Sequence, residues 1–416
     1  MISDKQIMRI LVDRAIEETP VLDMHTHIYT PCFGDLLLYG VDELITYHYL
    51  IAETFRYTGM PYARYWAMSK KEQADFIYQT LFIEHTPVSE SCRGVLTVLR
   101  KLGAPVGGSL NSIRDYLKRF SREEFVDKVF ELSHVDRAVM TNDPFDEQEH
   151  AVWRSGYVAD RRFVPALRLD GLLVYFEKNV DTLVRRGYRV SRALDETTFA
   201  ELRRFLEDEI GRMGAVYMAV SLPDTFRYPD DSVATRIIDE CVLPVATRLN
   251  IPFALMIGVK RQVNPGLLLA GDAVGKTAIE SIERLCADNP RTKFLATLLS
   301  RENQHELCVM ARKFRNLLIF GCWWFLNNPS IIDEMTRMRL ELLGTSMVPQ
   351  HSDARVLDQL IYKWTHSRSI IAAVLKDKYA DLMDTGWPLR EEEIRRDAGL
   401  LLGGAFEAFL KLRFEE

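Results

Sequence analysis

The length and composition of the sequence are those of a protein that buries a large hydrophobic core. It has 416 residues, of which 47% are hydrophobic, and a formal net charge of −6. Glycine and proline number only 22 and 16, which excludes a collagen-like or extensively disordered chain. The acidic balance argues against a nucleic-acid binder held by phosphate contacts. A small anionic substrate is still allowed, because one well-placed arginine outweighs a mildly acidic average.

The cysteines and the first residues indicate the cellular compartment. The six cysteines have no C-x-x-C spacing, so neither a zinc ribbon nor a disulfide framework is suggested. Residues 1–20 predict an amphipathic helix with acidic residues rather than a signal peptide. No window approaches the roughly 18 consecutive apolar residues that span a bilayer. We therefore expect a cytoplasmic protein with reduced thiols, without membrane or nucleic-acid partners.

Short apolar runs rich in β-branched and aromatic residues recur along the chain and predict strands. Eight such runs occur, at 21–28, 137–143, 163–170, 216–223, 252–259, 293–300, 316–325 and 346–353. Helical-period segments separate most of them, and several runs turn polar only at their last residues. Parallel strands buried on both faces, with a site at their carboxyl ends, have this pattern. Eight of them alternating with helices predict an α/β protein of the (β/α)8 TIM-barrel type.

The regular spacing fails once, between the first and second expected strands. About 110 residues separate them, far more than one crossover requires. Helical patterns at 41–55 and 70–83 lie in this stretch. We therefore expect a single barrel domain over 1–416, with a helical insertion at about 30–135 that covers the C-terminal mouth of the barrel. The tail after residue 354 predicts helices.

His25 and His27 come at the end of the first expected strand. The period of two in a strand places both imidazoles on one face, where each can offer a nitrogen to one metal ion. The alternative is a pair of hydrogen-bonded histidines near a turn. The carboxyl end of a barrel strand is where barrel enzymes keep catalytic groups, which favours the metal interpretation.

A second polar cluster, HSDAR, ends the last expected strand. Asp353 lies at its tip and Arg355 two residues further on. A carboxylate from this strand would complete a His-His-Asp set, which suits zinc or a similar divalent ion and leaves coordination positions open. The alternative for Asp353 is an N-cap of the following helix. The H-x-H pair favours ligation.

Arg168 precedes the end of the third expected strand among apolar neighbours, so its guanidinium should have an anionic partner. Two interpretations remain open. One is an internal ion pair with Asp170 or Asp143, and the other is a clamp for a substrate carboxylate.

Four further residues are weaker candidates. His48 lies on an apolar stripe of the insertion and is either a core histidine or a lid contact. Trp323 and Trp324 end the seventh expected strand, where core packing is the default and one ring could face the cavity. Arg301, with His305 nearby, follows the sixth expected strand and could equally form a network at a helix start.

Together these segments resemble the uronate isomerases, the glucuronate and galacturonate isomerase branch of the amidohydrolase superfamily. The likeness extends over nearly the whole chain and is carried by DMHTHIYTPCFGDLLL, DELITYHYL, MTNDPFD, ALRLD, MAVSLP, LLSRENQHEL, FGCWWFLNNP and PQHSDARV. It implies a distorted (β/α)8 barrel. It also implies reversible conversion of D-glucuronate to D-fructuronate and of D-galacturonate to D-tagaturonate.

By position, the resemblance implies roles for individual residues. The metal ligands would be His25, His27 and Asp353, and the substrate would be bound by His48, Arg168 and Arg355, beside Tyr49 and one of the two tryptophans. The expected fourth, fifth and sixth strands lack the inward histidines and lysine that hydrolytic members of the superfamily use. We therefore do not expect a binuclear hydrolase. We expect one divalent ion per chain, with zinc as the first choice.

The reaction of an aldose–ketose isomerase then assigns the chemistry. Asp353 is expected to take the proton from carbon 2, with Arg355 stabilising the enediolate and Tyr49 donating a proton. Direct hydride transfer remains an alternative. So do two other functions, a mononuclear metal-dependent hydrolase and a catalytically silent carboxylate-binding protein. The expected partner is a small uronate, and a homo-oligomer is expected.

Overall fold

A curled parallel sheet forms the centre of the protein in a computed structural model, which describes residues 2 and 4–414. Its strands pair in the order β1-β2-β3-β4-β5-β7-β8, and the short β6 pairs antiparallel with β5. The strands are β1 (Val21–Thr26), β2 (Val135–Asn142), β3 (Phe163–Arg168), β4 (Met218–Pro223), β5 (Phe253–Lys260), β6 (Ala273–Val274), β7 (Phe294–Leu298) and β8 (Leu317–Ile319). This arrangement is the predicted distorted (β/α)8 barrel.

The eighth expected strand, 346–353, is not a regular strand, and in this detail the prediction is wrong. The segment makes one isolated bridge, between Phe320 and Val348, and then hydrogen bonds to β1. Asp353 N donates to His25 O at 3.2 Å, so the segment still lies between β8 and β1 and closes the barrel. A regular ladder fails here because Pro349 has no N–H and Asp353 adopts a positive φ of 51°.

Helices connect the strands as a barrel requires. The helical segments from β2 to the closing segment are α9 (Glu147–Ser155), α10 (Asp170–Leu173), α11 (Phe176–Arg185), α12 (Glu196–Met213), α13 (Val233–Ile237), η3 (Ile238–Val242), α14 (Leu243–Leu249), η4 (Pro265–Gly271), α15 (Ile279–Asp288), η5 (Arg301–Asn303), α16 (Gln304–Ala311), η6 (Trp324–Leu326) and α17 (Pro329–Leu343). Local sequence sets their ends. Asp195 caps α12 by accepting from Thr198 N, and Gly214 ends it in the left-handed conformation.

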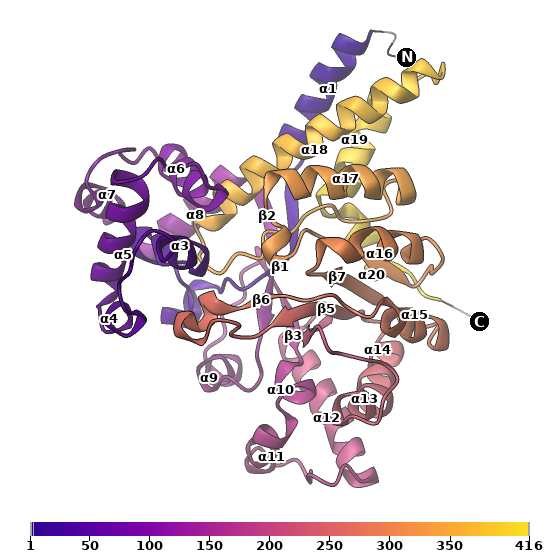
Figure 1. The fold of residues 1–416 in the computed structure, drawn as a ribbon. Coiled ribbons are helices and arrows are strands. Elements are labelled where there is room, and N and C mark those ends of the chain that lie inside the picture. Colours follow the sequence, from indigo (N-terminus) through magenta and orange to yellow (C-terminus); the bar gives the residue numbers. More distant parts are fainter. Residues whose placement is uncertain (1, 3, 415–416) are drawn as a thin grey trace.

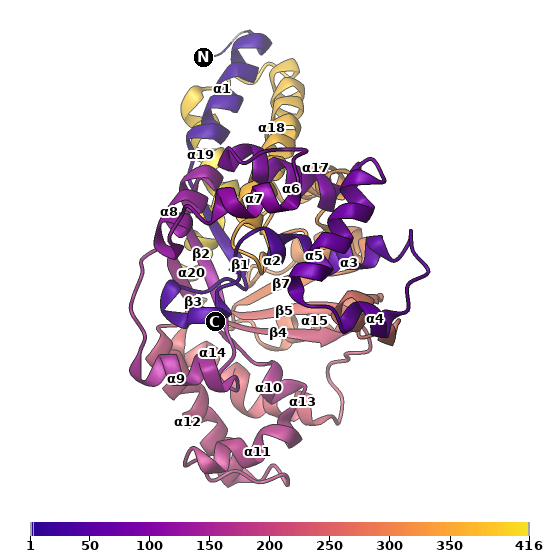
Figure 2. The same ribbon diagram turned by 90° about the vertical axis from the view of Figure 1, so that its left-hand side faces the viewer.

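The long stretch between β1 and β2 is helical. It contains η1 (Pro31–Leu36), α2 (Val41–Ile45), α3 (His48–Thr54), α4 (Tyr62–Trp66), α5 (Lys70–Tyr78), η2 (Gln79–Ile83), α6 (Glu90–Leu102), α7 (Leu110–Leu117) and α8 (Arg122–Ser133). The helix predicted at 70–83 is present as α5 and η2. The one predicted at 41–55 divides at Tyr47, whose ψ of 143° is extended. Figures 1 and 2 show α3 to α7 gathered into one lobe beside the sheet.

The C-terminal helices serve two purposes. These are α18 (Gln359–Asp384), α19 (Glu391–Gly399), η7 (Leu400–Gly404) and α20 (Ala405–Lys411). The first two pack beside α1 (Lys5–Glu18) in an arm that projects beyond the barrel (Figures 1 and 2). Helix α20 places Phe406 and Phe409 in the hydrophobic cluster inside the barrel, and the Phe406 ring lies 6.0 Å from that of Tyr217. The C-terminus therefore fills the end of the barrel away from the mouth.

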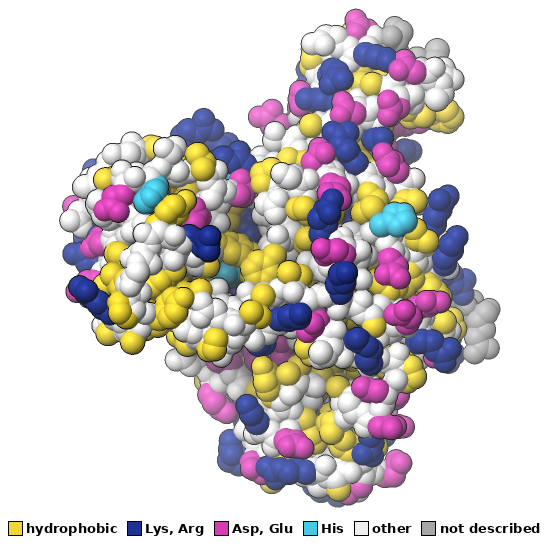
Figure 3. Space-filling view, viewed as in Figure 1, with side chains coloured by type: hydrophobic (Ala, Val, Ile, Leu, Met, Phe, Trp, Pro, Cys, Tyr) yellow, Lys and Arg dark blue, Asp and Glu magenta, His cyan; other side chains and the backbone are white. Residues whose placement is uncertain are grey.

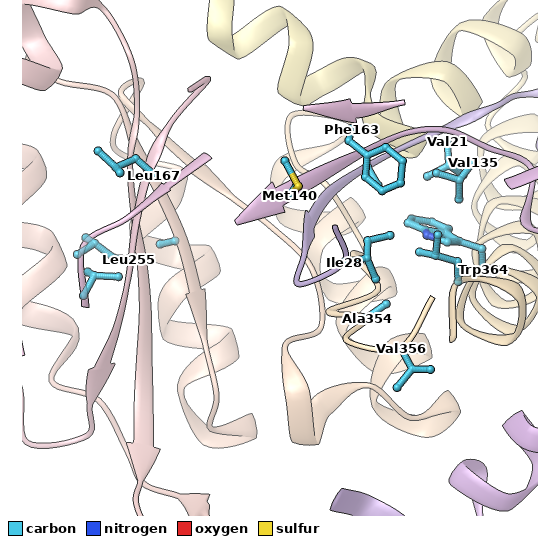
Figure 4. Close-up of a cluster of buried hydrophobic side chains, with 14 of the residues drawn as sticks. Val21, Ile28, Val135, Met140, Phe163, Leu167, Leu255, Ala354, Val356 and Trp364 are labelled. Atoms are coloured by element: carbon cyan, nitrogen blue, oxygen red, sulfur yellow. The ribbon is translucent and has the colours of Figure 1, made fainter. Parts of the chain in front are cut away.

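A second hydrophobic cluster joins the strands to the helices around them. Figure 4 shows Trp364 of α18 beside Val21 and Val135, with Ala354 and Val356 below it. The Trp364 indole also donates a 2.8 Å hydrogen bond to the buried Asp23 Oδ2. Helix α18 is thereby fixed against β1 and the closing segment, the two elements that carry the H-x-H and HSDAR motifs.

Acidic and basic side chains are interspersed over the face of the molecule that Figure 3 shows. All six cysteines are free thiols, as predicted. Within the described part of the chain, no helix has the length and apolar character to span a membrane.

Gly321 allows the chain to turn at the end of β8, and its replacement tests the packing there. Its φ is 65°, and a Cβ would lie 1.6 Å from His351 Nδ1. We expect Gly321→Ala to lower the free energy of unfolding by about 2–5 kcal/mol, from backbone strain and overpacking. Gly214→Ala is the control, because Gly214 has φ 68° but open space at its Cβ position, and should cost only about 1 kcal/mol. Equal losses in urea titrations of the two variants would contradict this packing.

Candidate metal centre and active site

Strand β1 brings His25 and His27 to the mouth of the barrel on one side, as their spacing predicts. The pairing of β1 with β2 is irregular between Asp23 and Thr26, the kind of local bulge that re-aims side chains next to active sites. The two imidazole rings lie edge to face, with centroids 5.2 Å apart.

Hydrogen bonds behind His25 fix which of its nitrogens is free. Its Nδ1 lies 3.0 Å from the hydroxyl of Tyr217, and that hydroxyl donates its only hydrogen to Met24 O at 2.8 Å. The tyrosine oxygen must therefore accept from His25, so we assign the proton to Nδ1. This leaves the lone pair of Nε2 directed into the mouth.

His27 is held in the same way by a different partner. Its Nδ1 lies 3.0 Å from Thr141 Oγ1, which donates to Thr26 O at 2.8 Å. The same reasoning places the proton on Nδ1 and the lone pair on Nε2. Burial lowers the pKa of His27 well below its usual value, with the charges of Arg355 and Arg168 acting in the same direction. Burial also lowers the pKa of His25 to about 3, so both rings are neutral.

Asp353 completes the cluster. Its Oδ1 lies 3.3 Å from His27 Nε2 and 3.9 Å from His25 Nε2, and the three ligand atoms lie within 4.8 Å of one another. This oxygen is buried and accepts no hydrogen bond. Two neutral imidazoles cannot neutralise the charge of a buried carboxylate. A divalent cation would neutralise it and would bind to the Nε2 lone pairs of both rings and to Oδ1 of Asp353. The residues therefore fit a metal, and no other such cluster occurs among the described residues.

Arg355 and Tyr49 lie beside this cluster, and neither the Arg355 guanidinium nor the Tyr49 hydroxyl has a hydrogen-bond partner among the described residues. The Arg355 side chain is half-buried and has no hydrogen bond or ion pair with a described residue, although its backbone N–H donates to Gln359 Oε1. The Tyr49 hydroxyl is buried without a hydrogen-bond partner. Burial raises the pKa of Tyr49 well above 10, and the charge of Asp353 raises it further, so the phenol keeps its proton.

The structure joins His48 to Trp324. The Trp324 indole donates a 2.9 Å hydrogen bond to His48 Nε2, which leaves the His48 proton on Nδ1. Both predicted tryptophans lie beyond the end of β8 rather than within a strand, because Gly321 turns the chain and Trp324 has a positive φ of 47°. Both rings are buried in the hydrophobic cluster inside the barrel, and of the two Trp324 is the one that hydrogen-bonds a predicted site residue.

Arg168 has the anionic partner that its burial requires. Its Nη2 lies 3.2 Å from Asp170 Oδ1, and it lines a cavity of about 480 Å³ together with Asp143 and Arg261. Burial opposes its charge, but Asp170 and Asp143 raise the pKa of Arg168 above its usual value. The internal ion pair therefore exists, and the guanidinium also borders this cavity, whose lining includes the carboxylates of Asp143, Asp146 and Asp170.

Arg301 lies away from the cluster. Its side chain is 56% exposed, and its Nε lies 3.0 Å from Glu334 Oε2 of α17. This is a surface ion pair.

The sequence prediction missed three residues that support the cluster. Tyr217 and Thr141 orient the two imidazoles, and Lys363 of α18 is buried near Tyr49. Thr141 lies in the polar end of a predicted strand, which was a usable signal. Tyr217 lies within an apolar run and Lys363 within a helical pattern, so neither had a local signal.

Comparisons with known proteins identify the family. No protein-family model matches the chain, and no curated protein sequence does. The structure of a uronate isomerase from Bacillus halodurans C-125 is 54% identical, with a TM-score of 0.96, over 99% of this chain and 97% of that one. A uronate isomerase from Thermotoga maritima (14% identity, TM-score 0.77, 99% and 100% coverage) and a glucuronate isomerase from Caulobacter crescentus (15%, 0.69, 99% and 95%) share the fold. The chain belongs to the uronate isomerase family.

Proposed function

We propose that the protein converts D-glucuronate to D-fructuronate and D-galacturonate to D-tagaturonate. The observation that carries this proposal is the 54% identity to a uronate isomerase over almost the whole of both chains. A buried carboxylate beside an unengaged arginine and an unengaged tyrosine, at the barrel mouth, supports the same reaction.

The reaction needs a base, a group that stabilises negative charge and a proton donor. Asp353 takes the proton from carbon 2 of the open-chain aldose while the carbonyl electrons move onto O1, giving an enediolate. Tyr49 donates a proton to O1, and the cationic Arg355 stabilises the developing charge. Asp353 then returns its proton to carbon 1 while the phenolate of Tyr49 takes the proton from O2, which gives the ketose and restores both residues.

A metal ion would be held by Nε2 of His25, Nε2 of His27 and Oδ1 of Asp353. We infer one divalent ion per chain and expect zinc, because the set combines nitrogen and carboxylate donors and leaves positions open. When bound, the ion supplies positive charge that orients and polarises substrate oxygens. Lys260 at the end of β5 is half exposed and pairs with Asp224, so β5 offers no inward lysine for a second ion.

The metal inference can be tested through the residue behind His27. Thr141→Val removes the acceptor for His27 Nδ1–H, so we expect metal affinity to fall roughly tenfold to a hundredfold. Thr336→Val is the matched control, because Thr336 is equally buried but lies on α17 with its hydroxyl unpartnered. Metal analysis of the purified wild type should give about one ion per chain. Two tightly bound ions, or equal affinity in both variants, would contradict the inferred site.

Asp353 is expected to be required for turnover. Asp353→Asn keeps the size of the side chain but removes the negative charge that binds a cation and accepts a proton. We expect the variant to fold and to lose most of its ketose formation. Near-normal turnover would remove Asp353 as the base.

Arg168 would fix the end of the sugar far from the reacting carbons. A uronate has its carboxylate on carbon 6 and reacts at carbons 1 and 2, so Arg168 can bind the carboxylate while Asp353 reaches carbon 2. His48 would add a second hydrogen bond to the carboxylate through Nδ1–H, since its Nε2 is occupied by Trp324.

The carboxylate clamp predicts a defined loss. We expect Arg168→Met to lower kcat/KM for D-glucuronate roughly tenfold to a few hundredfold, the effect of losing about 1.5–3 kcal/mol, with metal content unchanged. The wild type should prefer D-glucuronate to neutral D-glucose. An unaltered kcat/KM in the variant would leave only the ion pair with Asp170 as the role of this arginine.

The function itself is tested by a coupled assay for ketose formation from D-glucuronate. The expected result is fructuronate production by the wild type. Binding of the uronate without turnover would instead indicate a carboxylate-binding protein, and cleavage of amides or esters without ketose formation would indicate a hydrolase.

We also infer a cytoplasmic location. All six thiols are free, five of them buried, which suits a reducing compartment.

A further inference from the structure

Lys363 is a buried lysine whose ammonium group has no conventional partner. It is the fifth residue of α18 and is 2% exposed. Its Nζ lies 5.8 Å from the ring centroids of Tyr49 and Tyr362 and makes no hydrogen bond or ion pair with a described residue. Burying an ammonium group without a hydrogen-bond or ion-pair partner costs free energy, so we expect its charge to have a function.

Lys293 is a second buried lysine of the same protein, and its role is structural. It is 1% exposed, but its Nζ donates to Leu410 O at 2.6 Å and to Leu412 O at 3.3 Å. Those bonds secure the end of α20. Lys363 donates to no backbone carbonyl of a described residue, so a structural role like that of Lys293 does not explain its burial.

The charge of Lys363 acts within the candidate active site. It contributes to the lowered pKa values of His48 and His351, and the charges of Asp353, Asp23 and Glu90 act on it in return. Burial lowers the pKa of Lys363 to about 8, so most of it is charged at pH 7.

We propose that Lys363 is a positioning residue for the isomerisation, acting through Tyr49. Its ammonium holds the Tyr49 ring in place and stabilises the negative charge that grows on the phenol as Tyr49 donates its proton to the substrate oxygen. This inference rests on the proposed function. The Tyr49 ring otherwise contacts the rings of its chain neighbours His48 and Tyr47 and that of Phe325, and its hydroxyl has no hydrogen-bond partner.

The contact should matter more in the transition state than in the substrate complex. A cation attracts a neutral phenol ring through the ring quadrupole and attracts the ring more strongly as the oxygen becomes negative. An interaction that strengthens only as charge develops raises kcat and leaves substrate binding unchanged. Loss of Lys363 is therefore expected to appear in kcat rather than KM.

The test compares Lys363→Met with two other variants. We expect Lys363→Met to lower kcat for D-glucuronate roughly twofold to thirtyfold, with KM and metal content unchanged. Lys363→Arg should restore most of the lost kcat, because it keeps a cation that can stack on an aromatic ring. Lys293→Met is the matched control and should lower the unfolding temperature without lowering kcat.

A double-mutant cycle then shows whether Lys363 acts through Tyr49. In a Tyr49→Phe background, where no phenol oxygen remains, Lys363→Met should cause little further loss of kcat. Should Lys363→Met not fold, Lys363→Gln is measured in the same cycle and the same results decide. An unaltered kcat, or an equal loss with and without the Tyr49 hydroxyl, would overturn the inference. Absence of ketose formation by the wild type would instead refute the proposed function.

Discussion

The candidate active site depends on one carboxylate oxygen that has no hydrogen-bond partner. Asp353 Oδ1 is buried between two neutral imidazoles, and each imidazole is held by a hydrogen bond that leaves Nε2 as its free nitrogen. Such an arrangement is unfavourable without a cation and favourable with one. Two side chains orient the imidazoles. Tyr217 immediately precedes β4, and Thr141 lies in β2. The barrel as a whole therefore determines the geometry of the site.

The fold places its irregular features at the mouth of the barrel. Asp353 and Trp324 both have positive φ, β1 changes register beside His25, and the closing segment forms no regular strand. Conformations of this kind persist only where the surrounding structure holds them. Here Trp364 of α18 and Ser352 N of the closing segment donate to the two carboxylate oxygens of Asp23 in β1, and α20 fills the opposite end of the barrel. The regular part of the molecule thus supports the strained part that carries the chemistry.

Much of this could be predicted from the sequence because it depends on local patterns. The strand positions, the helical insertion and the H-x-H pair follow from periodicity within a few residues. The irregularity of the closing segment was only partly predictable, since Pro349 is visible in the sequence whereas the positive φ of Asp353 is not. Lys363 and Tyr217 could not be found either, because their roles arise from packing between elements far apart in the sequence. Arg301 was selected for its place after a strand and lies at the surface. The single-domain organisation and the homo-oligomeric state stay predictions.

We infer that His25, His27 and Asp353 bind one cation through the atoms that the hydrogen-bond network leaves free. Anomalous diffraction from crystals of the zinc-loaded protein measures this directly. We expect a single strong peak bonded to Nε2 of both histidines and to Oδ1 of the aspartate, with Tyr217 and Thr141 still hydrogen-bonded to Nδ1 of the two rings. A peak bonded through Nδ1, or a cation bound elsewhere while these three side chains remain without one, would contradict it.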